Sequence, residues 1–592
     1  MLLARLAPLL LAFVIISSST VALMPVHAQE TPTPTGPRLF DDPELTVQLY
    51  AEGLRRPTSM AFLGEDDLLV LEKDAGTVRR IVDGILLPEP LLDVNVGVID
   101  ERGMLGIAVS RNEQLGVTYV FVYFTEMPDR DGSDIDGVEP LGNRLYRYEF
   151  IDGQLVNGKL LLDLPAKYSS FHNGGKTIIG PDNNLYILVG DQQTPGVQPF
   201  THLTTTQNRA DTLYPDGTGG ILRVTQDGEP VQNLFGGEYP MDLYYAYGIR
   251  NGFGLDFDPV TGVLWDTENG PDLKDEINRV EPGFNGGWRI VQGFVEPTTD
   301  MSRLVEFPGL SATKDSLVGR AEAVSFKAQG LGGKFTEPLF VWQLPIAPTA
   351  LQFLDSDKLG DNYENDLFAA SFNRGEIYHW DLVEDRTDLH LTGPLEDRVE
   401  NNPAGYDGIK FAQGFGAITD MLVGPDGYLY VNGFFNGNIY RIMSVEDAAQ
   451  QSPPDKYQLR IEQWTFGIDH RITGGSVESM SADPQTKTIL VNINSTSDGV
   501  LSMELPRTVI DADEELTVLI DGEVAATVHE LIATEGYRIL AIDFPEGSSE
   551  IEIVGTFLAP EFGVIPAIML AAGVAAVIVA RWKYPIFKGR TI

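Results

Sequence analysis

A strand, turn and strand pattern recurs between Leu39 and about Val445, and it constrains the fold more than any other feature of the chain. Each instance has a strand, a turn with Asp, Gly or Pro, a second strand that ends in an aromatic residue or valine, and a third strand after a polar loop. Six irregular copies of one meander predict an all-β fold with a six-bladed β-propeller, and five or seven blades are alternatives. The six copies are Pro57–Ile81, Met104–Phe150, Gly174–Val224, Gly248–Val280, Ala347–Leu382 and Gly416–Ile442.

The pattern changes after Gln450. Short strand-like runs follow, separated by turns such as Asp521-Gly522, and about a hundred residues of this kind predict a small β-sandwich-like domain. The runs are Ile489–Ile493, Gly499–Leu505, Leu516–Ile520, Arg538–Ile542 and Glu550–Val554. The predicted organisation is a signal peptide in 1–28, a linker in 29–38, the propeller in 39–447, a linker in 448–456, the sandwich in 457–558 and a terminal segment in 559–592.

Composition excludes several classes of function. The 592 residues carry a formal charge of −43, which argues against a nucleic-acid partner because the phosphate backbone would be repelled. Cysteine is absent, so disulfide frameworks, thiolate metal sites and cysteine nucleophiles are excluded together.

Both ends of the sequence suggest export. Arg5, the apolar run Leu6–Ile16 and the small residue Ala28 are typical of a secretory signal peptide. Near the other end, Val564–Ala580 is uninterrupted and apolar and is followed by basic residues, which predicts a transmembrane helix with its basic end in the cytoplasm. With the preceding Pro560-Glu561-Phe562-Gly563, this segment resembles the sorting signal of archaeosortase substrates. That resemblance implies transfer to a lipid anchor, and a plain single-pass anchor is the alternative; either places the protein at the extracellular face of the membrane.

The richest local motif is Tyr247–Trp288, which combines glycine, acidic and aromatic residues. Two strand-like runs flank the turn Asp258–Thr261, and the polar loop Glu268–Pro271 follows. Strands that end in loops rich in carbonyls and carboxylates suit oxygen ligation of a hard cation such as calcium.

The same segment resembles the soluble quinoprotein glucose and aldose sugar dehydrogenases, the glucose/sorbosone dehydrogenase family. The ordered elements are R-N at Arg250, G-x-L-W at Gly262, E-x-G-P at Glu268, D-E-I-N at Asp275 and the final Trp288. The resemblance implies a propeller that oxidises a sugar or alcohol hydroxyl with pyrroloquinoline quinone and calcium, and passes electrons to an external acceptor.

Two residues are candidates for proton transfer. His172 stands in Phe171-His172-Asn173-Gly174, similar to the family setting in which a histidine takes the proton of the sugar hydroxyl. A histidine suits that role because its pKa lies near the working pH. Asp191 matches the family's G-D-Q and would orient His172 or cap a turn.

The remaining candidates are implied as cofactor contacts. Arg250, also a candidate catalytic residue, would face the quinone, and a fixed guanidinium suits an anionic planar ligand. The backbone carbonyls of Gly270 and Pro271 would hold calcium. Further candidate contacts to cofactor or substrate are Glu101, Asn251, Asn269, Asn373, Arg374 and Thr419.

The chain also departs from the family pattern. Relatives carry R-x-R-D in the last blade, where this chain has Ala417 and Thr419 before Asp420, and they carry lysine where Asn373 stands next to Arg374. Each lost charge-assisted bond to a tricarboxylate is worth about 1.5–3 kcal/mol. Three hypotheses therefore follow: a quinoprotein oxidoreductase, a non-catalytic calcium-binding propeller that binds glycan or protein at the cell surface, and a lactonase-like hydrolase.

Overall fold

The computed structural model describes residues 37–559 except 41, 114, 129–137, 194–201, 210–211, 213, 232, 237, 302–332, 402–407, 450–454, 463, 514 and 535. The predicted signal peptide, most of the first linker and nearly all of the terminal segment lie outside the described residues. Among the residues that are described, no helix has the length and apolar character needed to cross a membrane.

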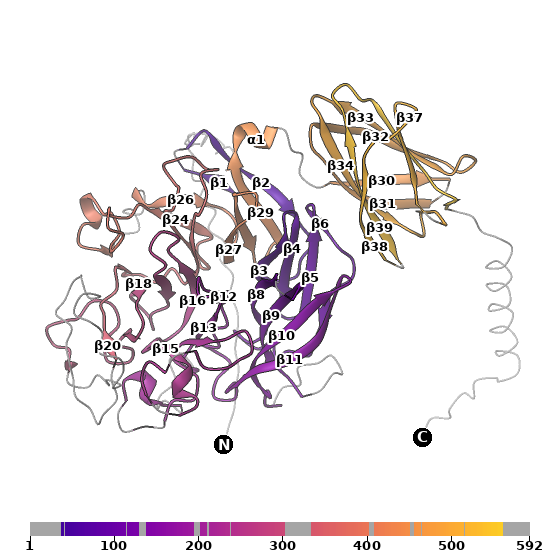
Figure 1. Cartoon of the computed structure of the whole chain (residues 1–592). Coiled ribbons are helices and arrows are strands. Elements are labelled where there is room, and N and C mark those ends of the chain that lie inside the picture. Colours follow the sequence, from indigo (N-terminus) through magenta and orange to yellow (C-terminus); the bar gives the residue numbers. More distant parts are fainter. Residues whose placement is uncertain are drawn as a thin grey trace, which may run out of the picture. The chain divides into compact units, whose positions relative to one another are not determined.

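The chain is all-β, as the sequence predicts (Figure 1). The strands before Val445 form six sheets. The first sheet contains β3(Pro57–Gly64), β4(Asp67–Glu72), β5(Thr77–Val82), β6(Ile85–Leu86) and β7(Leu92–Asp93), and the second contains β8(Met104–Asn112), β9(Val117–Glu126), β10(Gly142–Ile151) and β11(Gln154–Leu164). The third contains β12(Thr177–Ile179), β13(Leu185–Val189), β14(Gly220–Val224), β15(Tyr244–Tyr247), β19(Phe284–Asn285) and β20(Lys334–Phe335), and the fourth contains β16(Gly252–Phe257), β17(Leu264–Glu268), β18(Asp275–Val280), β21(Phe340–Trp342) and β25(Val399–Glu400). The fifth contains β22(Pro348–Phe353), β23(Leu367–Ser371), β24(Glu376–Trp380), β26(Lys410–Gln413) and β1(Arg38–Leu39), and the sixth contains β27(Ile418–Val423), β28(Leu429–Gly433), β29(Asn438–Ser444) and β2(Leu45–Ala51).

These sheets form a closed ring. The first strand of each meander contacts the first strand of the next, in the order β3, β8, β12, β16, β22 and β27, and β27 returns to β3. The ring is fastened by β2, which pairs antiparallel with β29 at the other end of the region. A ring of meanders with one strand borrowed from the start of the chain is consistent with a β-propeller.

Aromatic and aliphatic residues between neighbouring sheets form the cores of the ring. Trp265, Trp342 and Trp380 are fully buried in one such layer, and Tyr50 and Tyr430 pack edge to face in another. The sequence pattern finds the inner strands well. It misses the outer strands β11, β15 and β26 and the closing strand β2. Long connections separate β15, β26 and β2 from their partners, whereas β11 follows β10 through the tight turn Asp152-Gly153, beyond the end of the predicted copy.

The strands after Asp455 form two five-stranded sheets around one apolar core. One sheet contains β30(Asp455–Ile461), β31(Trp464–Ile472), β34(Gly499–Pro506), β39(Tyr537–Phe544) and β38(Val528–Ala533). The other contains β32(Gly475–Asp483), β33(Thr488–Ser495), β40(Glu550–Val554), β36(Thr517–Ile520) and β37(Glu523–Val524), and β35(Ile510–Asp511) pairs separately with β41(Phe557–Leu558).

The stretch predicted as the second linker differs from the expectation. It is preceded by a short helix, α1(Val445–Ala449), and β30 begins at Asp455, inside the predicted linker. The strand was missed because its burial alternates weakly at its solvent-facing start.

Candidate active site

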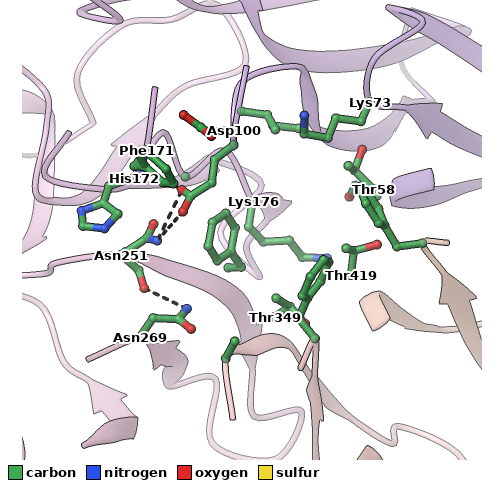
Figure 2. A pocket seen from close by; sticks show the side chains of 18 of the residues that line it. Thr58, Lys73, Asp100, Phe171, His172, Lys176, Asn251, Asn269, Thr349 and Thr419 are labelled. Carbon is green, nitrogen blue, oxygen red and sulfur yellow. Dashed lines mark hydrogen bonds between the residues drawn. The ribbon is translucent and has the colours of Figure 1, made fainter. Parts of the chain in front are cut away.

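A cavity of about 620 Å³ is lined by residues from all six sheets of the ring or from the loops beside them (Figure 2). Thr58 comes from β3, Leu105 from β8, Thr349 from β22 and Thr419 from β27. The sheet of β12 contributes through the loop that precedes this strand, and the sheet of β16 contributes through its preceding loop and through Phe253 in the strand. Residues far apart in the sequence therefore meet here because the ring closes.

His172 lies in the wall of this cavity and is 2% exposed. Its Nδ1 is 2.6 Å from Oδ1 of Asp191, and the other oxygen of Asp191 accepts a 2.7 Å hydrogen bond from Nε1 of Trp288. Burial alone would raise the pKa of Asp191, but the charge of His172 and the hydrogen bonds from His172 and Trp288 outweigh it and lower that pKa. An ionised Asp191 holds the proton on Nδ1, which leaves Nε2 as the basic nitrogen.

The backbone around His172 is also specialised. His172 has a φ of +58°, a left-handed conformation that is uncommon outside glycine and recurs at functional sites. A Cβ at Gly190 would collide with the carbonyl of His172, so glycine is required beside Asp191. The G-D-Q motif thus brings the carboxylate close to the imidazole.

Glu101 contacts both the backbone of His172 and the side chain of Asn251, the residue before β16. Its Oε2 accepts a 2.6 Å hydrogen bond from the backbone N–H of His172, and its carboxylate accepts weaker bonds of 3.3 and 3.4 Å from Nδ2 of Asn251. Burial raises the pKa of Glu101, against the lowering effects of His172, Asn251 and Arg250. The Oδ1 of Asn251 is buried and has no partner among the described residues, so this wall offers an acceptor to a ligand.

Arg250 lines the same wall. Its Nη1 donates a 2.8 Å hydrogen bond to the backbone carbonyl of Asn269, and its guanidinium lies 5.5 Å from the ring centre of Trp288. Burial lowers the pKa of Arg250, and the surrounding carboxylates oppose that shift. The arginine is therefore held by backbone and aromatic contacts and presents a fixed cation to the cavity.

The predicted calcium loop lies beside Arg250. Asn269 and Pro271 line the cavity, and the N–H of Gly270 donates a 2.9 Å hydrogen bond to Asp275. Asp275 also accepts hydrogen bonds from the N–H groups of Ile346 and Ala347. The loop is thus anchored through its N–H groups, and that arrangement leaves carbonyls as its candidate ligands.

A lysine that no sequence motif indicated also lines the cavity. Lys176 reaches across the cavity toward Thr419, and its Nζ is 2.5 Å from Oδ1 of Asp420 (Figure 2). Asp420 also accepts hydrogen bonds from Ser59 Oγ and the N–H of Met60. The hydroxyl of Thr419 is 2.8 Å from the Pro57 carbonyl. Lys176 therefore brings a cation to the wall where Ala417 and Thr419 carry none.

Two more cations line the cavity. Lys73 donates to the Asp74 carboxylate at 2.9 Å and to the Val98 carbonyl at 3.2 Å, and Arg56 pairs with the same Asp74. Counting Lys, Arg, Asp and Glu, the lining has Arg56, Lys73, Lys176 and Arg250 against Asp100 and Glu101. Asp74 and Asp420 contact three of these four cations, so the cavity offers cationic donors to a ligand while its local charge is close to balanced.

Two of the predicted contact residues are not among the lining residues. Asn373 and Arg374 follow Phe372, which does line the cavity, but their N–H groups hydrogen-bond to the Ile346 carbonyl and to Ser371 Oγ in the turn. The structure therefore brings together His172, Asp191, Glu101, Arg250, Asn251, Asn269, Pro271 and Thr419, with Gly270 adjacent, and it leaves Asn373 and Arg374 outside the cavity wall.

Below the Arg250 wall, four oxygen-bearing side chains form a buried array on one face of the β17–β18 hairpin. Asp266 is opposite Asn278 and Glu268 is opposite Glu276, and each is at most 2% exposed. Burial raises the pKa of Asp266 to about 7 and that of Glu276 to about 8. Both oxygens of Asp266 lack a partner among the described residues, so this array is rich in acceptors and poor in donors.

Aromatic rings border the cavity. Phe372, Phe434 and Phe435 contact one another with ring centres 5.1–5.7 Å apart, and Phe435 is 68% exposed. Phe171 and Phe253 also line the cavity. Such rings provide flat apolar faces for a planar group or a sugar ring.

The sequence analysis gave no role to Lys176, Lys73 or Trp288. Lys176 lies four residues after His172, and Trp288 is the last residue of the motif Tyr247–Trp288. The proximity of Lys176 to the histidine was a usable signal. The hydrogen bond from Trp288 to Asp191 joins residues 97 positions apart, and nothing in the local sequence indicates it.

Comparison with known proteins supports the family that the motifs resemble. Residues 54–312 match the model of the Glucose / Sorbosone dehydrogenase family. This match contains four of the six first strands of the ring's meanders, β3, β8, β12 and β16, and it contains His172, Asp191, Arg250 and Gly270.

Curated relatives extend the similarity beyond that range. An uncharacterized protein of Synechocystis sp. is 27% identical over 422 residues, which are 68% of this chain and 88% of the relative. Aldose sugar dehydrogenase YliI of Escherichia coli is 23% identical over 397 residues, 65% of this chain and 89% of that protein. Quinoprotein glucose dehydrogenase B of Acinetobacter calcoaceticus is 26% identical over 318 residues, 48% and 62% respectively.

Among solved structures, the apo form of the soluble aldose sugar dehydrogenase of Escherichia coli has a TM-score of 0.49 and 20% identity, and covers 67% of this chain and 99% of its own. That score is too low to carry an argument. The family model and the curated relatives together support an oxidoreductase similar to the quinoprotein sugar dehydrogenases.

Proposed function

We propose that this protein is a quinoprotein oxidoreductase that oxidises a sugar or alcohol hydroxyl with pyrroloquinoline quinone over calcium. The observation that carries the proposal is the buried pair of His172 and Asp191 in a cavity that offers cationic donors to a ligand. The family match and the names of the two characterised relatives support the same reaction class.

The residues of the cavity fit the cofactor. Arg250 and Lys176 both line the cavity and could each meet a carboxylate or carbonyl of an anionic planar group. The unpartnered Oδ1 of Asn251 could accept a hydrogen bond from it. The carbonyls of Gly270 and Pro271 would hold the calcium ion.

When bound, pyrroloquinoline quinone supplies a two-electron acceptor for the hydride of the substrate carbon. The protein must then remove the hydroxyl proton. Nε2 of His172 takes that proton, and the ionised Asp191 stabilises the imidazolium that forms. Trp288 holds Asp191 in place, and the Phe372, Phe434 and Phe435 rings limit the access of water.

The proposal includes the setting of the enzyme. The strand meanders of residues 39–447 would form a six-bladed propeller and residues 457–558 a β-sandwich. The apolar segments Leu6–Ile16 and Val564–Ala580 support an exported protein held at the outer face of the membrane by a helix or a lipid anchor. Electrons would leave through an external acceptor.

The test is turnover by the full-length protein. The protein is supplied with pyrroloquinoline quinone and calcium, and reduction of an artificial electron acceptor is followed for a panel of aldoses and simple alcohols. We expect turnover that requires both quinone and calcium and stops when calcium is chelated. Turnover that persists without added quinone after exhaustive dialysis, or no turnover with any member of the panel, would contradict the proposal.

One observation favours a second function. Phe435 is 68% exposed at the rim, and Ala417 and Thr419 add no cation to the cavity. A non-catalytic calcium-binding propeller that binds a glycan through this aromatic rim would show glycan binding that His172→Ala leaves intact, without any turnover.

A further inference from the structure

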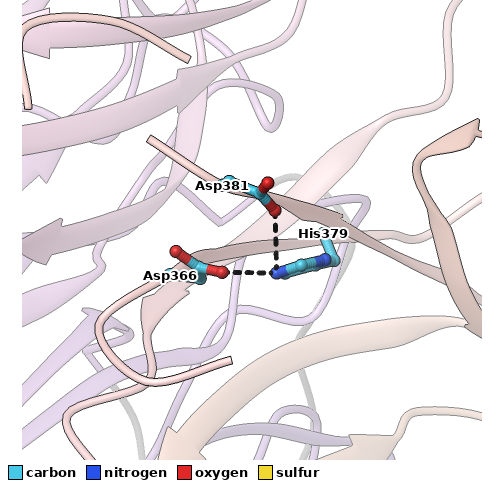
Figure 3. A group of neighbouring side chains, drawn as sticks. All are labelled: Asp366, His379 and Asp381. Carbon is cyan, nitrogen blue, oxygen red and sulfur yellow. Dashed lines mark hydrogen bonds and ion pairs between the residues drawn. The ribbon is translucent and has the colours of Figure 1, made fainter. Parts of the chain in front are cut away.

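A second cluster of ligating side chains lies on the sheet formed by β22, β23, β24, β26 and β1. Asp366, His379 and Asp381 each offer an atom, and these atoms lie within 4.8 Å of one another (Figure 3). None of the three lines the central cavity. The cluster is therefore separate from the candidate active site.

The strand register places these side chains on one face of the sheet. Leu367 pairs with Trp380 and Phe368 with His379, so Asp366 falls opposite Asp381 at the end of the ladder. His379 and Asp381 are two positions apart and share a face. Two carboxylates directly opposite each other repel, and a cation between them would remove that cost.

A fourth residue comes from the following hairpin. Leu382 and Leu389 form an antiparallel bridge, and the N–H of His390 donates a 2.8 Å hydrogen bond to the carbonyl of Asp381. This register places His390 opposite Asp381 on the other side from Asp366. Nδ1 of His390 is 3.5 Å from Oδ2 of Asp381.

The distances suit a tetrahedral metal centre. Nε2 of His379 is 2.9 Å from Oδ2 of Asp366 and 3.9 Å from Oδ1 of Asp381. Zinc bonds of about 2.0–2.1 Å at tetrahedral angles separate ligand atoms by about 3.4 Å. The two separations between His379 and the carboxylates bracket that value. A single imidazole N–H can satisfy only one of the two carboxylates at a time, whereas a metal ion satisfies both.

The histidine ring is held in place from behind. Tyr363 and Phe368 pack against His379 with ring centres 5.1 and 4.9 Å away, and Phe411 lies 6.3 Å away. Asp381 and His390 are 60% and 58% exposed in their side chains, so an ion from solution can reach the cluster. The site thus combines a fixed ligand with open access.

We propose that Asp366, His379 and Asp381 bind a divalent transition metal of the zinc type, with His390 as an outer contact to Asp381. An imidazole nitrogen with two carboxylate oxygens favours zinc over calcium, which prefers six or more oxygens. The bound ion would join β23, β24 and the following hairpin into one unit. The proposal does not depend on the quinone chemistry of the central cavity.

The test uses untagged full-length protein that has been treated with chelator and then saturated with calcium. Cobalt(II) is added as a spectroscopic probe, and zinc binding is measured by calorimetry. We expect one metal per chain and a visible absorption band of tetrahedral cobalt that zinc abolishes. Absence of binding, or an octahedral cobalt spectrum, would overturn the proposal.

Exposed residues of the cluster supply the decisive variants because their replacement leaves the core unchanged. Asp381→Asn and His390→Gln should each weaken zinc binding by at least about tenfold, since even the loss of an outer contact to a metal ligand costs about 10–100-fold. Asp385→Asn, an exposed acid in the same hairpin, should leave it unchanged. Equal affinity in Asp381→Asn and Asp385→Asn would show that the metal binds elsewhere.

Discussion

The ring of sheets and the C-terminal sandwich bury very different groups. The ring places His172, Asp191 and Arg250 in its interior, together with the Asp266 array. The sandwich core consists of aliphatic side chains such as Leu501 and Ile551. Among its described residues, buried ionisable groups such as Glu504 and Arg538 are few, and Arg538 pairs with Asp511 and Glu530. Burying polar groups costs free energy unless they are paired, so their concentration in the ring makes that region the candidate functional site.

The largest expected effect is on turnover. His172→Ala removes the proposed base and should lower kcat/KM by about 100- to 10,000-fold, the usual contribution of general base catalysis. The matched control is His529→Ala, an exposed histidine of the sandwich strand β38, which should leave kcat/KM unchanged. Equal rates for both variants would remove the functional distinction between the two regions.

Stability of the sandwich should respond to loss of apolar volume. Ile551→Ala removes a fully buried side chain from its core and should lower the free energy of unfolding of this region by about 2–5 kcal/mol. Chemical denaturation followed by limited proteolysis measures it. Because no cavity residue is touched, kcat/KM of the folded fraction should be unchanged, and a large drop in it would contradict the separation of roles.

The cationic wall should control cofactor affinity. Lys176→Met should weaken quinone binding by about 10- to 100-fold, since a hydrogen bond to a charged group contributes about 1.5–3 kcal/mol. Lys456→Met, an exposed lysine of the sandwich that pairs with Asp469, is the matched control. Quinone affinity that is the same in both variants would show that Lys176 serves Asp420 alone.

The smallest expected effect is on the pH dependence of the free energy of unfolding. Burial raises the pKa of Asp266 from 3.8 to about 7, so the folded state binds the proton more tightly than the unfolded state does. The protonated form of Asp266 therefore adds to the free energy of unfolding. This contribution is present in full below the pKa of Asp266 in the unfolded state and is lost as pH rises through about 7, its pKa in the folded state. Asp266→Asn removes this dependence, and its amide can donate to the unpartnered oxygens of Glu268 and Asn278.

We therefore expect Asp266→Asn to raise the free energy of unfolding by about 1–3 kcal/mol at pH 8 and to change it little at pH 4. Urea denaturation at the two pH values, at constant calcium, measures the difference. Glu504→Gln in the sandwich is the parallel case, because burial raises the pKa of Glu504 to about 7 as well. A larger gain at pH 4 than at pH 8 would contradict the sign of the argument.

Local patterns in the sequence were enough to predict the inner strands of the ring, and the family motifs marked His172 and Asp191 as candidates, with a contact between them as one of two readings of Asp191. The meander repeats mark the strands, and the histidine and aspartate lie in the two short motifs that flank one hairpin. The role of Lys176 could not be predicted in this way. Its partner Asp420 lies 244 positions away, and they meet only because β27 packs against β3 when the ring closes.

For Asn373 and Arg374, the sequence motif suggested contacts with a cofactor, but neither residue lines the cavity. Their place in the loop after β23 suggested cofactor contacts, but the turn that returns the chain to β24 uses their backbone and directs only Phe372 to the cavity. The direction of a side chain in a tight turn depends on backbone dihedrals that neighbouring residue types do not fix. The outer strands β15 and β26 were missed for a related reason, since long connections and not tight turns join them to their partners.

The most direct test of the account is an equilibrium titration of the full-length protein with pyrroloquinoline quinone in excess calcium, followed by quinone absorbance. The account predicts saturation at one quinone per chain in the micromolar range or tighter, because Arg250 and Lys176 supply cations to the cavity despite Ala417 and Thr419. No saturable binding at micromolar quinone would contradict it, and the cavity would then be a site for a different anionic ligand.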